Sequence, residues 1–85
     1  MIYIDTPAAY PFRKKRGTWS HLCVDKNIPL SVLHDFAKSR GIKKHWFHNN
    51  KRFPHYDIHG CDVETLLNEV TLVSSRELVK LCARG

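Results

Sequence analysis

Apolar and polar positions follow two different periods along the chain, and these periods predict strands and helices in turn. Residues 1–4 are apolar and β-prone and Asp5 ends the run, which predicts a short buried strand. Apolar residues at helical spacing then follow Pro29, a residue that suits the first turn of a helix. Gly41 is a good residue for the position just after a helix. The pattern therefore predicts a helix from about Pro29 to Arg40.

The second half of the chain predicts shorter elements. Asp62 is a natural N-cap for a helix whose apolar face runs to Val70. Ser74 and Glu77 fit a capping box, with Ser74 at the N-cap and Glu77 at the third helical position, which predicts a last helix that begins after Ser74. Three further segments have the apolar or alternating pattern of strands, although the first of them also suits an extended crossing segment: 19–24, 55–58 and 71–73.

The predicted order is strand, helix, strand, helix, strand, helix. Because parallel neighbours need helical crossovers, this order predicts an α/β fold: a small single-layer β-α-β-α-β-α domain with a mostly parallel sheet of three or four strands. We expect one domain over residues 1–85, since the chain is too short for two cores. Residues 6–18 hold two prolines, one glycine and the basic block 13–16, and are expected to form a loop.

The charge of the chain points to a class of partner. The formal net charge is +6 and the isoelectric point is about 9.5, which favours nucleic acid, a nucleotide or an acidic protein as the partner. A basic surface that is merely solvated remains an alternative. No apolar run is long enough for a membrane span, and no signal peptide is recognised. Three cysteines without a CxxC pair predict a reducing, cytoplasmic location.

Residues 45–59 carry the most conspicuous chemistry. Four of the six histidines lie in these fifteen residues, together with the rings of Trp46, Phe47, Phe53 and Tyr56. Aromatic faces beside imidazoles and positive charge suit a ligand that has flat rings and phosphates.

Several polar residues are expected to meet at the carboxyl edge of a parallel sheet, where such folds bind ligands. Asp5 and Asp57 are candidate ligands for magnesium or manganese, although an aspartate at a strand end also caps loops. His21 and His55 are candidates for acid–base catalysis. Structural zinc is not indicated, because no tight pair of ligands is present. His34, next to the apolar face of the first helix, is expected to be a half-buried core residue or a hydrogen-bonding residue.

A phosphate is expected to bind where the last helix begins. Arg76 offers a forked cation beside the free N–H groups of a helix start. Plain helix capping accounts for Ser74 and Glu77 but leaves Arg76 unexplained. The full set of candidate ligand-binding residues is Trp19, Ser20, His48, Tyr56, Ser75 and Arg76.

Short blocks in this order also carry a family resemblance. The segments 19–22 (WSHL), 55–57 (HYD) and 75–78 (SREL), with the strand that ends at Asp5, resemble a family of small bacterial and phage proteins known as domain of unknown function 4031. The resemblance spans nearly the whole chain. It implies one domain in a cytosolic or phage setting, and it implies no reaction. The basic block 13–16 departs from the family pattern, as does the lack of Gly-Ala before the third strand.

A weaker likeness is to PIN-type nucleases, whose first strand also ends in a metal-binding aspartate. The late aspartate of that family is replaced here by Ser74-Ser75-Arg76. This likeness is an analogy at the level of the fold.

Three functions therefore stay open from the sequence. The first is a binding module for a phosphate-bearing ligand, either nucleic acid or a nucleotide. The second is a metal-assisted phosphodiesterase or nuclease that uses Asp5, Asp57 and a histidine. The third is a phage protein that binds an acidic protein of the host in the host cytoplasm.

Overall fold

The computed structural model describes residues 1–9 and 18–84. Six strands and three α-helices are present in this part of the chain, with one short 3₁₀ turn, η1, at Lys44–Trp46. The strands are β1 (Ile2–Asp5), β2 (Ala8–Ala9), β3 (Thr18–Val24), β4 (Phe47–His48), β5 (His55–His59) and β6 (Thr71–Val73). The helices are α1 (Leu30–Ser39), α2 (Gly60–Leu66) and α3 (Ser75–Cys82).

The strands form one mixed sheet in the order β4-β5-β3-β1-β6, and β2 pairs with the start of β3. Only β1 and β6 pair in parallel, whereas β1–β3, β2–β3, β3–β5 and β4–β5 are antiparallel. The α/β class is confirmed, but the prediction of a mostly parallel sheet with three or four strands is wrong.

The error has a simple physical origin in the strand order. Helix α1 joins β3 to β4 and helix α2 joins β5 to β6, and the antiparallel pairings make each of these two pairs run in the same direction. The helices are thus crossovers, as predicted. However, β5 lies between β3 and β4, and both β3 and β1 lie between β5 and β6. The sequence indicates a crossover without indicating which strand fills the gap.

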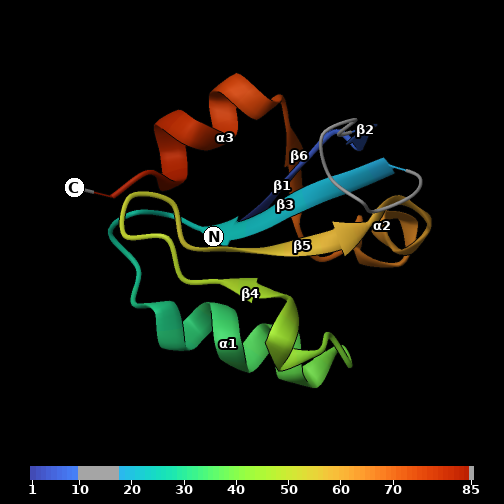
Figure 1. The fold of residues 1–85 in the computed structure, drawn as a ribbon, viewed down its shortest axis with the longest axis horizontal. Coiled ribbons are helices and arrows are strands. Elements are labelled where there is room, and N and C mark those ends of the chain that lie inside the picture. The colour runs from blue at the N-terminus through green and yellow to red at the C-terminus, as the bar shows by residue number, and fades with distance from the viewer. Residues whose placement is uncertain (10–17, 85) are drawn as a thin grey trace.

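The helices cover both faces of the sheet, so the predicted single layer is also wrong. Helix α3 lies on one side of the strands and α1 on the other (Figure 1). The larger core joins α1 and α2 to the sheet and includes Ile4, Leu22, Leu33, Ile58 and Val63, each at most 4% exposed. The smaller core lies under α3, where Leu78 and Cys82 pack against Cys23. The face of the sheet that α3 covers is therefore apolar directly beneath this helix.

Local expectations had mixed outcomes. Gly41 has a φ of 73°, the left-handed conformation expected after α1, and the Ile42 N–H donates to the Ala37 carbonyl at 2.9 Å. Ser74 is the N-cap of α3 as predicted, because its Oγ accepts the Glu77 N–H at 3.1 Å. Helix α2 already begins at Gly60, so Asp62 lies inside its first turn and is not its N-cap.

The segment 6–18 is not wholly a loop, because β2 pairs with β3 across Ala8–Trp19 and Ala9–Thr18. The basic block 13–16 lies outside the described residues. Within the described residues, no helix has the length and apolarity needed to cross a membrane.

Candidate functional site

The polar site grows from the alternation of side chains along β5. Because successive residues of a strand point to opposite faces, Tyr56 and Ile58 enter the larger core, while His55 and Asp57 face the α3 side. The same rule on β3 sends Leu22 into the larger core and His21 to the α3 side. The period of two thus places His55 and Asp57 together on the face of the sheet opposite the larger core.

Strand register then aligns groups from three strands. His21 on β3 pairs directly with Asp57 on β5. Ile4 pairs with Leu22 in the antiparallel register of β1 and β3, so Asp5 continues that register opposite His21. Asp5, His21 and Asp57 therefore form a row across adjacent strands. The row lies on a face of the sheet, not outside the strand ends where we expected it.

Asp5 is the anchor of this row. It is fully buried, and its Oδ1 accepts the backbone N–H of His21 at 2.6 Å. Its Oδ2 accepts the Nδ1 of His21 and the hydroxyl of Ser75, each at 2.9 Å. A carboxylate can only accept, so these contacts fix the proton of the neutral His21 ring on Nδ1 and leave the lone pair on Nε2. Asp5 thus orients His21 and ties the start of α3 to the sheet.

His55 is held in a similar way by a backbone group. Its ring is 7% exposed, and its Nδ1 donates to the Phe53 carbonyl at 2.7 Å. Its Nε2 is buried and has no hydrogen-bond partner among the described residues, although it lies 3.3 Å from Oδ1 of Asp57. Since Nδ1 carries the proton, two lone-pair atoms face each other here. This arrangement is repulsive unless a cation or a second proton joins them.

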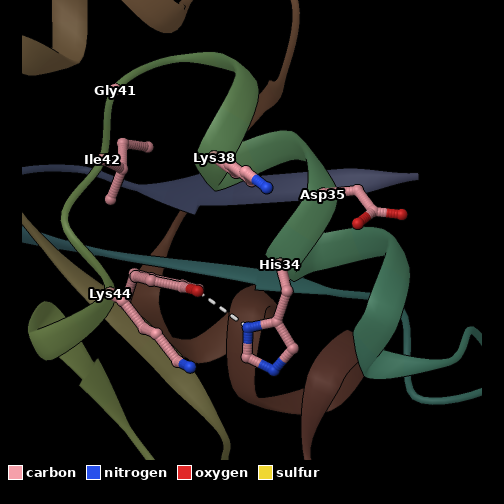
Figure 2. A pocket seen from close by; sticks show the side chains of 7 residues that line it. His34, Asp35, Lys38, Gly41, Ile42 and Lys44 are labelled. Carbon is pink, nitrogen blue, oxygen red and sulfur yellow. Dashed lines mark hydrogen bonds between the residues drawn. The ribbon is translucent and has the colours of Figure 1, made fainter.

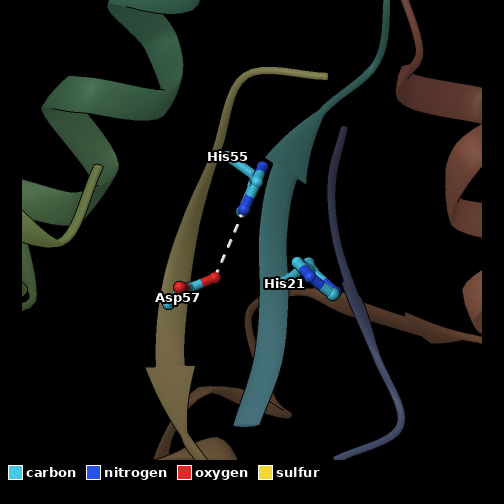
Figure 3. A group of neighbouring side chains, drawn as sticks. All are labelled: His21, His55 and Asp57. Atoms are coloured by element: carbon cyan, nitrogen blue, oxygen red, sulfur yellow. Dashed lines mark ion pairs between the residues drawn. The ribbon is translucent and has the colours of Figure 1, made fainter. Parts of the chain in front are cut away.

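A candidate metal site is formed by His21, His55 and Asp57. Each offers one ligand atom, and these atoms all lie within 4.8 Å of one another. Figure 3 shows His55 and Asp57 on β5 and His21 on the neighbouring β3. Two ligands about 2.0 Å from a tetrahedral ion are roughly 3.3 Å apart, which matches the separation of His55 and Asp57. The ligand atom of His21 lies within 4.8 Å of the other two.

His48 flanks this group from the edge strand β4. Its Nε2 lies 2.7 Å from Oδ2 of Asp57, and its ring stacks on His55 at a centroid distance of 5.2 Å. The side chain of His48 is 44% exposed, whereas that of Asp57 is 2% exposed. Asp57 therefore contacts two histidines, the buried His55 and the solvent-accessible His48.

Aromatic rings border the histidines. The Phe53 ring lies 5.8 Å from the ring of His21 and 5.0 Å from that of His55. Next along the strands, Trp19 meets His59 edge-on at 5.0 Å. A base or another flat ring bound near the cluster has partners of this kind to stack on.

The remaining candidates lie at different places around this group. Tyr56 lies on the opposite face, where its hydroxyl is 2.7 Å from Nδ1 of His34; the expectation that His34 makes a half-buried hydrogen bond is confirmed. Ser20 is buried and donates to the backbone oxygen of Asp5 at 2.8 Å. Arg76 is exposed in the first turn of α3, directly after the Ser75 that contacts Asp5.

Reasoning from the sequence missed two features of the site. The contact between Ser75 and Asp5 joins residues 70 positions apart, and no local pattern signals it. The pairing of His48 with Asp57 could have been found from the hairpin, because β4 and β5 are close in sequence and His48 pairs with His55. With His48 included, the cluster comprises Asp5, His21, His48, His55 and Asp57.

Comparison with known families gives one match. The model of the family described as "Protein of unknown function (DUF4031)" matches residues 2–85. The chain belongs to this family. No curated protein and no solved structure matches the chain. Family membership confirms the resemblance carried by the WSHL, HYD and SREL blocks. The first two blocks supply His21, His55 and Asp57 to the cluster, and the third supplies Ser75, which contacts Asp5.

Proposed function

We propose that the chain is a metal-dependent phosphodiesterase whose ion binds His21, His55 and Asp57. The observation that carries the proposal is the buried Nε2 of His55, which lies 3.3 Å from Oδ1 of Asp57 and has no hydrogen-bond partner among the described residues. A divalent cation held between the two atoms would satisfy both of their lone pairs. Three protein ligands leave further coordination positions for substrate and water, as in catalytic zinc sites.

The ligand types indicate which ion binds. Two imidazoles and one carboxylate suit zinc or manganese better than magnesium, which prefers oxygen ligands. We therefore favour manganese over magnesium among the ions expected from the sequence, and we add zinc. Asp5 takes a supporting role in this proposal, because its two oxygens already accept three hydrogen bonds. A carboxylate behind a metal-binding histidine fixes the ring and raises its basicity.

A phosphodiester fits the surroundings of the cluster. The chain carries a net charge of +6, and Arg76 follows the residue that contacts Asp5. The ring of Phe53 and the Trp19–His59 pair offer surfaces for bases. These features support a nucleic-acid or nucleotide substrate, with Arg76 holding a phosphate through its fork.

In hydrolysis, a water oxygen forms a new bond to phosphorus, the bond from phosphorus to one ester oxygen breaks, and that oxygen leaves with a proton. The ion supplies charge stabilisation for the phosphoryl oxygens and makes water a better nucleophile. His21 and His55 are each held through Nδ1, and so serve as ligands. His48, solvent-accessible beside Asp57, is the histidine best placed to pass a proton to the leaving oxygen.

The test is a metal titration of protein first stripped with a chelator. At 100 times its dissociation constant, zinc or manganese should add about 2.7 kcal/mol of stability. That gain raises the melting temperature by roughly 11–22 °C in a domain of this size. His55→Gln should abolish the shift, and His45→Gln, which changes an exposed histidine outside the cluster, should retain it.

Activity is then measured on a labelled oligonucleotide and on bis(p-nitrophenyl) phosphate. Metal-dependent cleavage that His55→Gln removes supports the enzyme. Tight metal binding without cleavage of either substrate would leave a metal-containing binding module for a phosphate-bearing ligand. If neither metal raises the melting temperature, the metal centre itself is refuted.

A further inference from the structure

A cavity lies on the face of the sheet opposite the histidine cluster. It is about 750 Å³ in volume, a size suited to a small-molecule ligand. Helix α1, the turn after it and strand β5 supply its walls (Figure 2). The residues that line it are His34, Asp35, Lys38, Gly41, Ile42, Lys44 and Tyr56. None of them belongs to the cluster formed by Asp5, His21, His48, His55 and Asp57.

The back of the cavity is a fixed polar pair. Tyr56 is 2% exposed, and its hydroxyl lies 2.7 Å from Nδ1 of His34. The His34 ring is held in turn by an edge-on contact with Phe47 at 4.6 Å. Burial raises the pKa of Tyr56, so the phenol is neutral at physiological pH. A neutral phenol and a neutral imidazole carry two polar hydrogens, and their mutual bond uses one. In either tautomer the pair retains one donor for a ligand.

The charged side chains around the cavity favour an anion. Lys38 and Lys44 line it from two different elements, α1 and η1, and neither forms an ion pair with another described residue. Asp35 contributes one negative charge, which leaves a net charge of +1 at the cavity with His34 neutral. Gly41, with its φ of 73°, makes the sharp turn that brings Lys44 to the same space as Lys38.

The remaining walls are apolar. Ile42, the ring of Tyr56 and the methylene stems of the two lysines offer a surface for a flat, uncharged body. A ligand that joins such a body to a compact, doubly charged group uses both parts of the cavity. A phosphate monoester supplies the acceptors that two ammonium groups and one neutral donor require.

We propose that this cavity is a second binding site, which takes a small molecule carrying a phosphate monoester on a flat ring, such as a nucleoside monophosphate. The site is independent of the proposed metal centre, because it uses the opposite face of β5. Adjacent residues of one strand, His55 and Tyr56, thus serve two different ligands.

The test uses the full chain after metal removal, so that the histidine cluster cannot bind the phosphate through an ion. The four common nucleoside monophosphates and phenyl phosphate are titrated by calorimetry, with adenosine and inorganic phosphate as the separate halves of the ligand. We expect at least one monoester to bind with one molecule per chain, and at least tenfold more tightly than either half.

The matched variants compare two lysine pairs. Lys38→Ala with Lys44→Ala should weaken binding at least tenfold, whereas Lys26→Ala with Lys80→Ala removes the same charge away from the cavity and should change it less than threefold. Circular dichroism melts show that each variant is folded.

Three results would overturn the proposal. The first is no binding of any monoester at millimolar concentration. The second is equal loss of affinity in both pairs of lysine variants, which indicates a diffuse charge effect. The third is loss of binding in His55→Gln, which places the ligand at the histidine cluster. Retained binding in His55→Gln, with loss in the Lys38 and Lys44 variant, supports the second site even if the metal centre fails its own test.

Discussion

The substitution Asp5→Asn separates the supporting role of Asp5 from a merely structural one. The carboxylate accepts three hydrogen bonds, two from His21 and one from Ser75, at distances of 2.6–2.9 Å. An asparagine keeps the shape but replaces one oxygen by an NH₂ group, which faces at least one donor. The variant therefore loses one or more hydrogen bonds to a buried charged group and brings two donors together.

The expected magnitudes follow from these contacts. A hydrogen bond to a charged group contributes about 1.5–3 kcal/mol, so the melting temperature should fall by roughly 6–24 °C. Loss of the group that orients a metal-binding histidine weakens metal affinity by about 10–100-fold. The first effect would follow from any structural role, whereas the second requires that His21 is a ligand.

The assay is a calorimetric titration with zinc at a temperature where every variant is folded. Ser75→Ala removes one of the three hydrogen bonds and leaves both contacts with His21, so it should lower stability and change zinc affinity little. Asp25→Asn alters a carboxylate that accepts the Asn27 N–H and is not part of the cluster, so it should leave affinity unchanged. If Asp5→Asn is less stable but binds zinc as wild type does, His21 is not oriented by Asp5 for metal binding.

Three further predictions concern the fold and its surface. Leu33→Ala should lower the free energy of unfolding by about 2–5 kcal/mol, because Leu33 is fully buried in the larger core. Val32 is 44% exposed on the same helix, so Val32→Ala should lower it by about 0.5 kcal/mol or less. Equal melting temperatures for the two variants would contradict the assigned helix face. Burial raises the pKa of Tyr56, so the phenol deprotonates in the unfolded chain before it does in the folded one, and stability should fall as pH rises above about 10. In denaturation measured against pH, Tyr56→Phe should reduce this loss. Oligonucleotide affinity should fall steeply with added salt, and alanines at residues 13–16 should make that dependence shallower, whereas a flat response in wild type would exclude phosphate contacts.

Local pattern predicted the elements better than their arrangement. The helix at Leu30–Ser39, the strand at His55–His59 and the cap at Ser74 follow from spacing and capping chemistry, which act over a few residues. The order of the strands in the sheet does not follow from such local patterns, because it depends on which strands lie between the two strands that each crossover joins. That order is determined by packing between segments far apart in the sequence, and the alternation within one strand carries no information about it.

The proximity of the candidate site residues was predicted for a reason that the structure replaces. The structure does bring together Asp5, His21, His55 and Asp57. They meet on a face of the sheet because of the strand register, and not at the carboxyl ends of parallel strands as expected. Their roles stay predictions. The sequence placed Tyr56 among the ligand-binding residues, whereas alternation sends it to the opposite face, away from its neighbours His55 and Asp57. Hydrogen bonds such as that from Ser75 to Asp5 have no signal in a single sequence.

The most direct measurement of the central claim is an anomalous diffraction map from a crystal of the chain soaked with zinc. The account predicts a peak about 2.0–2.2 Å from a nitrogen of His21, a nitrogen of His55 and an oxygen of Asp57, with Nδ1 of His21 still on Asp5. The same peak should be missing from His55→Gln. A map without a peak between these three residues, or with zinc bound only at exposed histidines such as His45, would contradict the account.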